Sequence, residues 1–356
     1  MFDCSDDVLA YHDEEVNLPE SDRSDMRDRR DVNRDRLKKG LKKSNKPAYR
    51  QCKSQGSYAM RLMVQSGDKD YDIDDGVYFN KEDLVGANGG EMTALEARKM
   101  VRDAVDDGKF KAAPEVRPKC VRVLYDEGYH VDLPVYRRVV EKNAAGKEVV
   151  HYELASSEWQ RSDARDVTDW FDGECEKLNP DKTAGGQVRR ITREIKKYAR
   201  SRASWKGKIL SGFGITKLVT ECFGSNADRE DKALRDTITA IRDRLNGNLV
   251  VKHPVTPNDT ITKGSDDARA KLLRDNLSGA LKKLEPLDKS DCSRKEALKC
   301  WDAVFSTTFF SDRLADDDEA ASAHVPAPFS SGLLKSGATT GIGRAAVNKQ
   351  GGGRYA

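Results

Sequence analysis

The stretch that decides the fold is Gln55–Tyr78, which reads QGSYAMRLMVQSGDKDYDIDDGVY. It holds a Gly-Ser pair and then, after a spacer, aspartates inside an apolar, strand-like run. Side chains at positions i and i+2 of a strand share a face, so Asp72 and Asp74 point the same way. An unpaired buried carboxylate is strongly disfavoured. These acids therefore either face water or hold a cation.

Composition limits the classes of protein that this chain can be. It has 356 residues, a net charge of +3, 37% hydrophobic and 35% charged residues, which suits one large or two moderate domains. The near-neutral balance does not indicate a stable partnership with nucleic acid. The acidic N-terminal segment lacks a signal-peptide pattern, and the apolar runs are shorter than a membrane span. Seven scattered cysteines are typical of reduced thiols. We expect a cytoplasmic protein with no membrane partner.

The first part of the chain predicts mixed α and β structure. Residues 19–43 read as a long, highly charged helix with a narrow apolar stripe. The stripe consists of Met26, Val32, Leu37 and Leu41. A further helix is predicted over 93–107, and strands over 77–79, 119–124, 129–136 and 148–154.

The pattern turns helical after about residue 160. Apolar residues recur at three-to-four spacing over 187–203, 229–246, 268–284 and 293–310. The residues after 314 are rich in Gly, Ala and Ser and are expected to be disordered in isolation. We therefore predict three parts: residues 1–160 as a core with a long N-terminal spine helix, 161–314 as a helical lobe, and 315–356 as a flexible tail.

A third acid completes a site. In YHVDLPVY (129–136), Asp132 shares a strand face with His130, while Val131 and Leu133 face the other way. Three carboxylates brought together repel unless a divalent cation lies among them, and oxygen ligands suit Mg²⁺ or Mn²⁺. His130 reads more simply as a packed or supporting residue than as a ligand.

The Gly-Ser pair suits a phosphate beside those acids. Gly56 lets the backbone approach closely, and Ser57 offers a hydroxyl and a backbone N–H. Acids that hold two metal ions next to a bound triphosphate can activate a hydroxyl and stabilise a leaving pyrophosphate. The combination is much more specific than a lone Asp-x-Asp.

These motifs resemble the polymerase-β-like nucleotidyltransferase superfamily. The words QGS, DIDDGVY and HVDLPVY look more narrowly like the bacterial cGAS/DncV-like nucleotidyltransferases of CBASS anti-phage systems. The resemblance covers roughly residues 15–312. It implies an α+β fold in which a nucleotidyltransferase core with a mixed sheet joins a C-terminal helical lobe. The two would form a bilobed cage with a central active site.

The resemblance also implies roles for individual residues. Asp72, Asp74 and Asp132 would be the catalytic acids and the ligands of two Mg²⁺ or Mn²⁺ ions, and Asp132 would help to deprotonate the attacking hydroxyl. The remaining nucleotide-binding residues would be Gln55, Gly56, Ser57, Arg122, Lys197 and Ser211. Lys196 and Arg193 are rivals for the place of Lys197.

The implied activity is synthesis of a cyclic dinucleotide or oligonucleotide, such as cyclic GMP–AMP, from ATP and GTP, with an effector activated downstream in antiviral defence. Two alternatives stay open. The first is a template-independent transferase that acts on an RNA end or a protein, for which the basic helix at 189–202 would offer a surface. The second is an inactive module that senses nucleotides.

The tail suggests a further partner. Some CBASS operons encode an E1/E2-like enzyme that joins the C-terminus of the nucleotidyltransferase to a target. A Gly-rich run that ends at Ala356 suits entry into such an adenylating site. The simpler reading is a terminus without a role.

Overall fold

The computed structural model describes residues 1–67, 71–126, 128–179, 186–256 and 258–314. Residues 1–314 form one compact unit. The predicted tail and the hypothesis on Ala356 lie outside the described residues. Within them, no helix has both the length and the apolar composition needed to cross a membrane.

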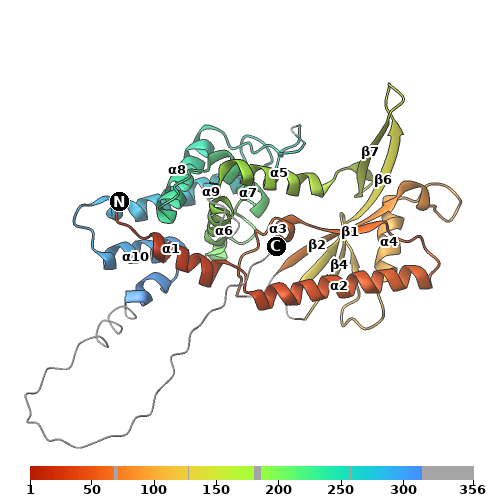
Figure 1. The fold of residues 1–356 in the computed structure, drawn as a ribbon, viewed down its shortest axis with the longest axis horizontal. Coiled ribbons are helices and arrows are strands. Elements are labelled where there is room, and N and C mark those ends of the chain that lie inside the picture. The colour runs from red at the N-terminus through yellow and green to blue at the C-terminus, as the bar shows by residue number, and fades with distance from the viewer. Residues whose placement is uncertain (68–70, 127, 180–185, 257, 315–356) are drawn as a thin grey trace, which may run out of the picture. The chain divides into compact units, whose positions relative to one another are not determined.

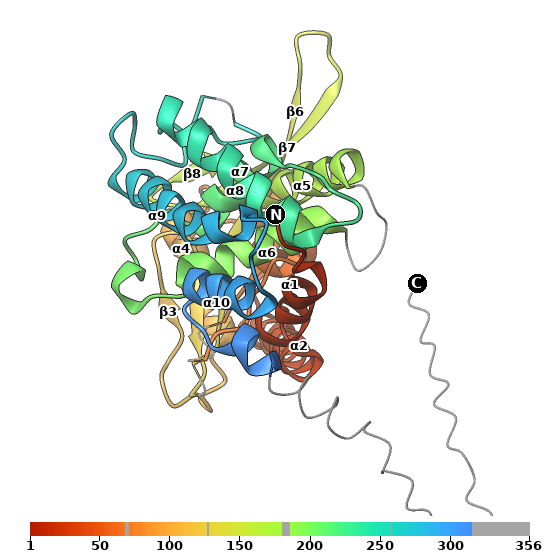
Figure 2. The same cartoon turned by 90° about the vertical axis from the view of Figure 1, so that its left-hand side faces the viewer.

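A mixed sheet forms the first part of the fold and confirms the α+β class. Its strands follow the order β3-β4-β5-β2-β6-β7-β8, and β1 pairs with β2. The hairpin of β6 and β7 extends beyond the helices in Figure 2. The strands are β1 (Gln51–Gln55), β2 (Asp72–Asn80), β3 (Glu115–Val116), β4 (Val121–Leu124), β5 (His130–Leu133), β6 (Val135–Lys142), β7 (Glu148–Ala155) and β8 (Trp159–Arg161).

Only Pro134 separates β5 from β6, and both strands run parallel to β2. Proline has no N–H to donate to a ladder, which explains the break between them. Its carbonyl still accepts from the Val77 N–H at 2.8 Å. The strand predicted over 129–136 therefore continues across the proline, and β2 is paired along both β5 and β6.

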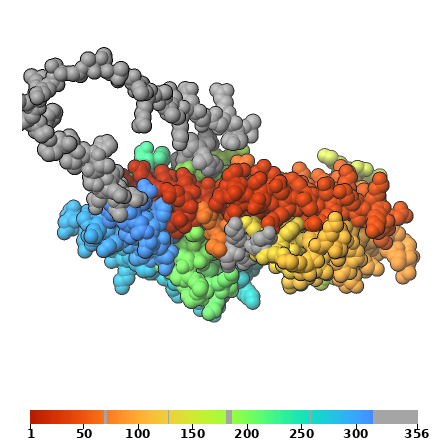
Figure 3. Space-filling model, turned by 90° about the horizontal axis from the view of Figure 1, so that it is seen from below, coloured from red at the N-terminus to blue at the C-terminus, as the bar shows by residue number. Residues whose placement is uncertain are grey.

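Helix α2 (Glu20–Lys43) lies along one face of the sheet together with α4 (Ala94–Val105), as Figure 1 shows. In Figure 3 the N-terminal residues run along the surface beside the sheet residues. The helices approach closely at Gly40, where an added Cβ would collide with the Ala104 carbonyl. Thr93 caps α4 and forms a capping box with Glu96.

The prediction that Val32 belongs to the buried stripe of α2 is wrong. Met26, Leu37 and Leu41 are buried, but Val32 is 45% exposed. Six residues of helix turn through about 600°, so Val32 lies about 120° away from Met26. Asn33 takes its place on the buried face.

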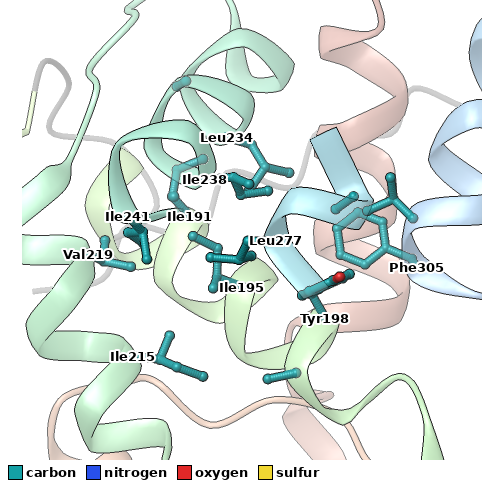
Figure 4. Packing of buried hydrophobic residues seen from close by; sticks show 14 of the residues in the cluster. Ile191, Ile195, Tyr198, Ile215, Val219, Leu234, Ile238, Ile241, Leu277 and Phe305 are labelled. Carbon is teal, nitrogen blue, oxygen red and sulfur yellow. The ribbon is translucent and has the colours of Figure 1, made fainter. Parts of the chain in front are cut away.

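The helical part has its own hydrophobic cluster. In Figure 4, Ile191, Ile195 and Tyr198 of α6 (Gln187–Arg200) lie amid apolar side chains from the neighbouring helices. Those helices are α5 (Ala164–Leu178), α7 (Gly212–Cys222), α8 (Glu230–Gly247), α9 (Ala268–Leu284) and α10 (Arg294–Phe305). Short helical segments are η2 (Lys81–Asp83), η3 (Ala203–Trp205) and η4 (Glu285–Asp288).

Two segments from the first 160 residues pack in this helical cluster. One is the N-terminal pair α1 (Ser5–Tyr11) and η1 (His12–Val16), which the sequence analysis did not predict. The other is the segment from Met60 to Val64, directly after the Gly-Ser pair. The predicted division at residue 160 stays a prediction, but the two clusters do not separate at that point of the chain.

Asp75 ties α2 to the sheet. It faces away from Asp72 and Asp74, and its carboxylate is fully buried. Arg34 of α2 donates to both of its oxygens, at 2.5 and 2.7 Å, and Ser54 donates at 3.2 Å. The third acid of the DIDD sequence, Asp75, therefore forms a structural ion pair with Arg34.

We expect Asp75→Asn to lower the free energy of unfolding by about 3 kcal/mol, because it leaves the Arg34 charge partly buried without its counter-ion. Urea denaturation followed by circular dichroism measures this. The matched control is Asp28→Asn, which removes an exposed acid from α2 and should change stability by less than about 0.5 kcal/mol. Equal losses for the two variants would contradict the structural role of Asp75.

Candidate active site

The predicted acids meet on one face of the sheet. The parallel pairing of β2 with β5 places Asp72 opposite His130 and Asp74 opposite Asp132. Asp72, His130 and Asp132 each offer a ligand atom, and these atoms lie within 4.8 Å of one another. Convergence follows from register, because directly paired residues on neighbouring strands point to the same face.

The three acids differ in how their surroundings compensate their negative charge. Arg122 on β4 donates to both oxygens of Asp132 at 2.7 Å. The His130 Nε2 lies 3.3 Å from Asp72, an interaction that raises the pKa of His130. Burial, together with the charges of Asp72 and Asp132, raises the pKa of Asp74 to about 7. The raised pKa means that the surroundings of Asp74 do not fully compensate its negative charge.

The donor set fits a divalent cation. Three carboxylates on adjacent strands provide the hard oxygen ligands that Mg²⁺ and Mn²⁺ prefer, and His130 adds an imidazole beside them. A cation among these groups would favour the ionised form of Asp74.

The Gly-Ser turn lies directly against the acids. Gly56 has φ +62°, and a Cβ added there would collide with the Asp74 carboxylate. Both the conformation and the lack of space require glycine. The turn begins the short helix α3 (Gly56–Ala59) immediately after β1. The turn that carries Ser57 therefore lies against Asp74.

Lys196, on α6, reaches this turn. Its Nζ donates to the Ser57 Oγ at 2.9 Å and to the Leu62 carbonyl at 2.6 Å, and the residue is only 2% exposed. Burial, reinforced by Arg200 and Arg193, lowers the pKa of Lys196 to about 7. Lys197, the residue predicted from the resemblance, instead donates to the Gln65 carbonyl at 3.3 Å.

The cationic residues of α6 are spaced to bind consecutive carbonyls. Arg189 donates to Met60 at 3.3 Å and Arg193 to Arg61 at 3.0 Å, as Lys196 does to Leu62. Positions 189, 193 and 196 share one helix face. Much of the basic character that the sequence showed is therefore directed inward, onto the segment after the Gly-Ser turn.

A cavity of about 630 Å³ opens beside Lys196 and Ser211. Ser211 caps α7, and its hydroxyl accepts from the Gly214 N–H at 3.2 Å. No acidic residue is found among the described residues that line the cavity. The cationic residues that line it are Lys196, Arg200, Arg202, Lys206 and Arg269.

The last four of these were not among the predicted site residues. Arg200 and Arg202 belong to the basic run that the sequence analysis noted, but Arg269 comes from a distant helix and has no local signal. A cavity lined in this way is suited to a polyanion.

Gln55 lies differently from the rest of the predicted set. Its side chain is bonded to two buried tyrosines rather than directed at the acids: Nε2 donates to the Tyr78 hydroxyl at 3.0 Å, and Oε1 accepts from Tyr136 at 3.2 Å. Any contact of Gln55 with a nucleotide would have to come from its backbone.

The Lys196 pKa generates a pH prediction. An ordinary lysine titrates near 10.5, so above about pH 7 the unfolded chain binds a proton that folded Lys196 has released. Stability rises with pH wherever the unfolded state binds more protons. From pH 7.5 to 9 we expect the free energy of unfolding to gain up to about 1.4 kcal/mol per pH unit relative to Lys196→Met. Chemical denaturation at several pH values measures both proteins, and equal pH slopes would refute a buried, proton-releasing Lys196.

Comparison with known proteins agrees with this geometry. Residues 50–136 match the family model described as the nucleotidyltransferase domain of cyclic GMP-AMP synthase DncV-like proteins. This segment contains the Gly-Ser turn, all three acids and Arg122.

Solved structures share the fold over most of the chain. Escherichia coli DncV with bound 3′-deoxy GTP matches with a TM-score of 0.61 and 15% identity, covering 82% of this chain and 92% of that one. Vibrio cholerae DncV with the linear intermediate 5′ pppA(3′,5′)pG matches with 0.61 and 16%, covering 82% and 91%. The V. cholerae cyclic AMP-GMP synthase, described as a prokaryotic cGAS homolog, matches with 0.62 and 17%, covering 82% and 92%.

At these sequence identities the similarity to the solved structures shows the fold alone. The match to the family model identifies residues 50–136 as a nucleotidyltransferase domain. The predicted resemblance is thereby confirmed: residues 50–136 form a nucleotidyltransferase domain of the DncV-like kind, within a chain that shares the fold of the DncV structures.

Proposed function

We propose that this protein joins nucleoside triphosphates into a cyclic dinucleotide or oligonucleotide, with ATP and GTP as the expected substrates. The observation that carries the proposal is the junction at Ser57. Its turn lies against Asp74 on one side, and its hydroxyl accepts from Lys196 on the other. A triphosphate there would have acids at its reacting end and cations around its far end.

Asp72, Asp74 and Asp132 would hold two Mg²⁺ or Mn²⁺ ions, which help to activate a hydroxyl and neutralise the charge of a leaving pyrophosphate. Ser57, Lys196 and Ser211 would bind the donor triphosphate. Arg122 lies beside Asp132 and would supply a guanidinium near the same phosphates.

The reaction transfers one nucleotide at a time. A ribose hydroxyl of the first nucleotide attacks the α-phosphorus of the second, so that one P–O bond forms while the bond to the pyrophosphate oxygen breaks. Asp132 accepts the hydroxyl proton. A second transfer within the linear product closes the ring and releases another pyrophosphate.

The structure of α6 favours this activity over transfer to an RNA end. An RNA-binding surface needs cations that face solvent along a strand's path. Three cations of α6 instead bind backbone carbonyls of the protein: Arg189, Arg193 and Lys196. Arg193 and Lys196 are also buried. The complete set of acids opposes the inactive-module alternative, because a binding module has no need for mutually repelling carboxylates.

The solved relatives support nucleoside triphosphates as substrates, since the V. cholerae structures include complexes with GTP and with 3′-deoxy ATP. By the family resemblance, the product would activate an effector in anti-phage defence, and an E1/E2-like partner would act on the C-terminus.

A product assay tests the reaction class. Incubation with all four ribonucleoside triphosphates and Mn²⁺ or Mg²⁺, followed by phosphatase and mass spectrometry, should give a phosphatase-resistant cyclic product. Asp72→Asn/Asp74→Asn should reduce its formation by at least about a thousandfold, since both changes remove charge at the reacting centre. Linear or tailed products that are lost in the same variant would support the RNA-end transferase instead.

The two neighbouring lysines of α6 form a matched pair of variants. We expect Lys196→Gln to weaken the binding of a non-hydrolysable ATP analogue by about tenfold or more, because it removes the amine that donates to Ser57, and a bound triphosphate would favour the protonated form of that amine. Lys197→Gln should change the affinity by less than about threefold, since it loses a bond to Gln65. Isothermal titration calorimetry measures both, and the reverse order would return the triphosphate clamp to Lys197.

A further inference from the structure

The side chain of Gln55 is fully enclosed. It is the last residue of β1, directly before the Gly56–Ser57 turn, and it is 3% exposed. Its amide bridges two tyrosines, donating to Tyr78 on β2 and accepting from Tyr136 on β6. Both ends of the amide are therefore anchored to strands other than its own.

The sheet leaves a specific space for this amide. Gly76 lies beside it, and a Cβ added at Gly76 would collide with the Gln55 Nε2 and contact Tyr136. The rings of the two tyrosines stack on each other, with centroids 4.6 Å apart and an interplanar angle of 8°. Tyr78 also donates to Asp163, the N-cap residue of α5, at 3.3 Å.

The amide and the acids occupy the same face of β2. Asp74, Gly76 and Tyr78 alternate along the strand and therefore point the same way. The register places Gln55 directly opposite Asp74. The next residue, Gly56, contacts the Asp74 carboxylate so closely that no Cβ would fit. The backbone of Gln55 therefore connects the enclosed amide directly to the turn that lies against Asp74.

We propose that Gln55 is a positioning residue: its amide, held between Tyr78 and Tyr136, sets the Gly56–Ser57 turn at the distance from Asp74 that binding of the donor triphosphate requires. This inference rests on the proposed function of the turn. It assigns Gln55 a role without direct contact between its side chain and the nucleotide. It also makes two tyrosines outside the acid cluster determinants of nucleotide affinity.

Removing single hydroxyl groups tests the proposal with little change in packing. Tyr136→Phe deletes the donor to Gln55, and Gln55→Leu deletes both of its hydrogen bonds while keeping an apolar volume. We expect Tyr136→Phe to raise the dissociation constant of a non-hydrolysable ATP or GTP analogue by about five- to tenfold, and Gln55→Leu by at least as much. Titration calorimetry in the presence of Mn²⁺ measures these constants.

The double variant Gln55→Leu/Tyr136→Phe separates positioning from general destabilisation. If the hydroxyl acts through the amide, the double variant should bind no more weakly than Gln55→Leu alone, because the two changes remove one shared interaction. The control is Tyr125→Phe, whose hydroxyl has no hydrogen-bond partner among the described residues. It should bind the analogue as the wild type does.

Thermal unfolding, followed by circular dichroism, accompanies each titration. Wild-type affinity in Tyr136→Phe and Gln55→Leu, whether or not they lose thermal stability, would overturn the inference and leave the amide a purely structural role. If Gln55→Leu fails to fold, Tyr136→Phe against Tyr125→Phe still decides the question.

The design keeps this inference apart from the proposed reaction. A wild-type protein that binds the analogue but makes no cyclic product would refute the cyclase proposal, while the affinity ratios would still test Gln55. Normal product formation with unchanged affinity in the variants would refute only the role of Gln55. A wild-type protein that bound neither analogue would overturn both.

Discussion

Repulsion among carboxylates on one face of the sheet is the constraint on which the rest of the structure depends. The parallel register of β2 and β5 makes Asp74 and Asp132 direct neighbours, with Asp72 two residues along the strand on the same face. The Arg122 guanidinium binds Asp132, and the His130 imidazole lies beside Asp72. Asp74 instead has a raised pKa. A divalent cation would neutralise the negative charge that these partners leave uncompensated.

Helix α6 connects this sheet site to the helical cluster. Its apolar face supplies Ile191 and Ile195 to the cluster, while its basic face binds the carbonyls of residues 60–62. The segment after the Gly-Ser turn is itself part of that cluster. Ser57 therefore lies where the two hydrophobic clusters meet, and its position depends on both.

Much of the site was predictable because its signals are local. Acids at alternate positions of a strand share a face whatever surrounds them, and the spacing of the Gly-Ser pair from Asp72 is visible in one line of sequence. The resemblance then indicated the fold, which the comparisons confirm. Local patterns erred where they had to choose a helix face: Val32 was placed on the buried stripe of α2, where Asn33 lies instead.

The sequence by itself determined which residue types meet: three acids on paired strands, a glycine where no Cβ fits, and a basic amphipathic helix. Tertiary structure alone decided which lysine of α6 reaches Ser57, because the 100° between neighbouring helix positions has meaning only once the partner surface is present. It also decided that Asp75 is a structural ion pair and that Gln55 faces Tyr78 and Tyr136. Hydrogen bonds between residues distant in the chain leave no periodic trace in its sequence.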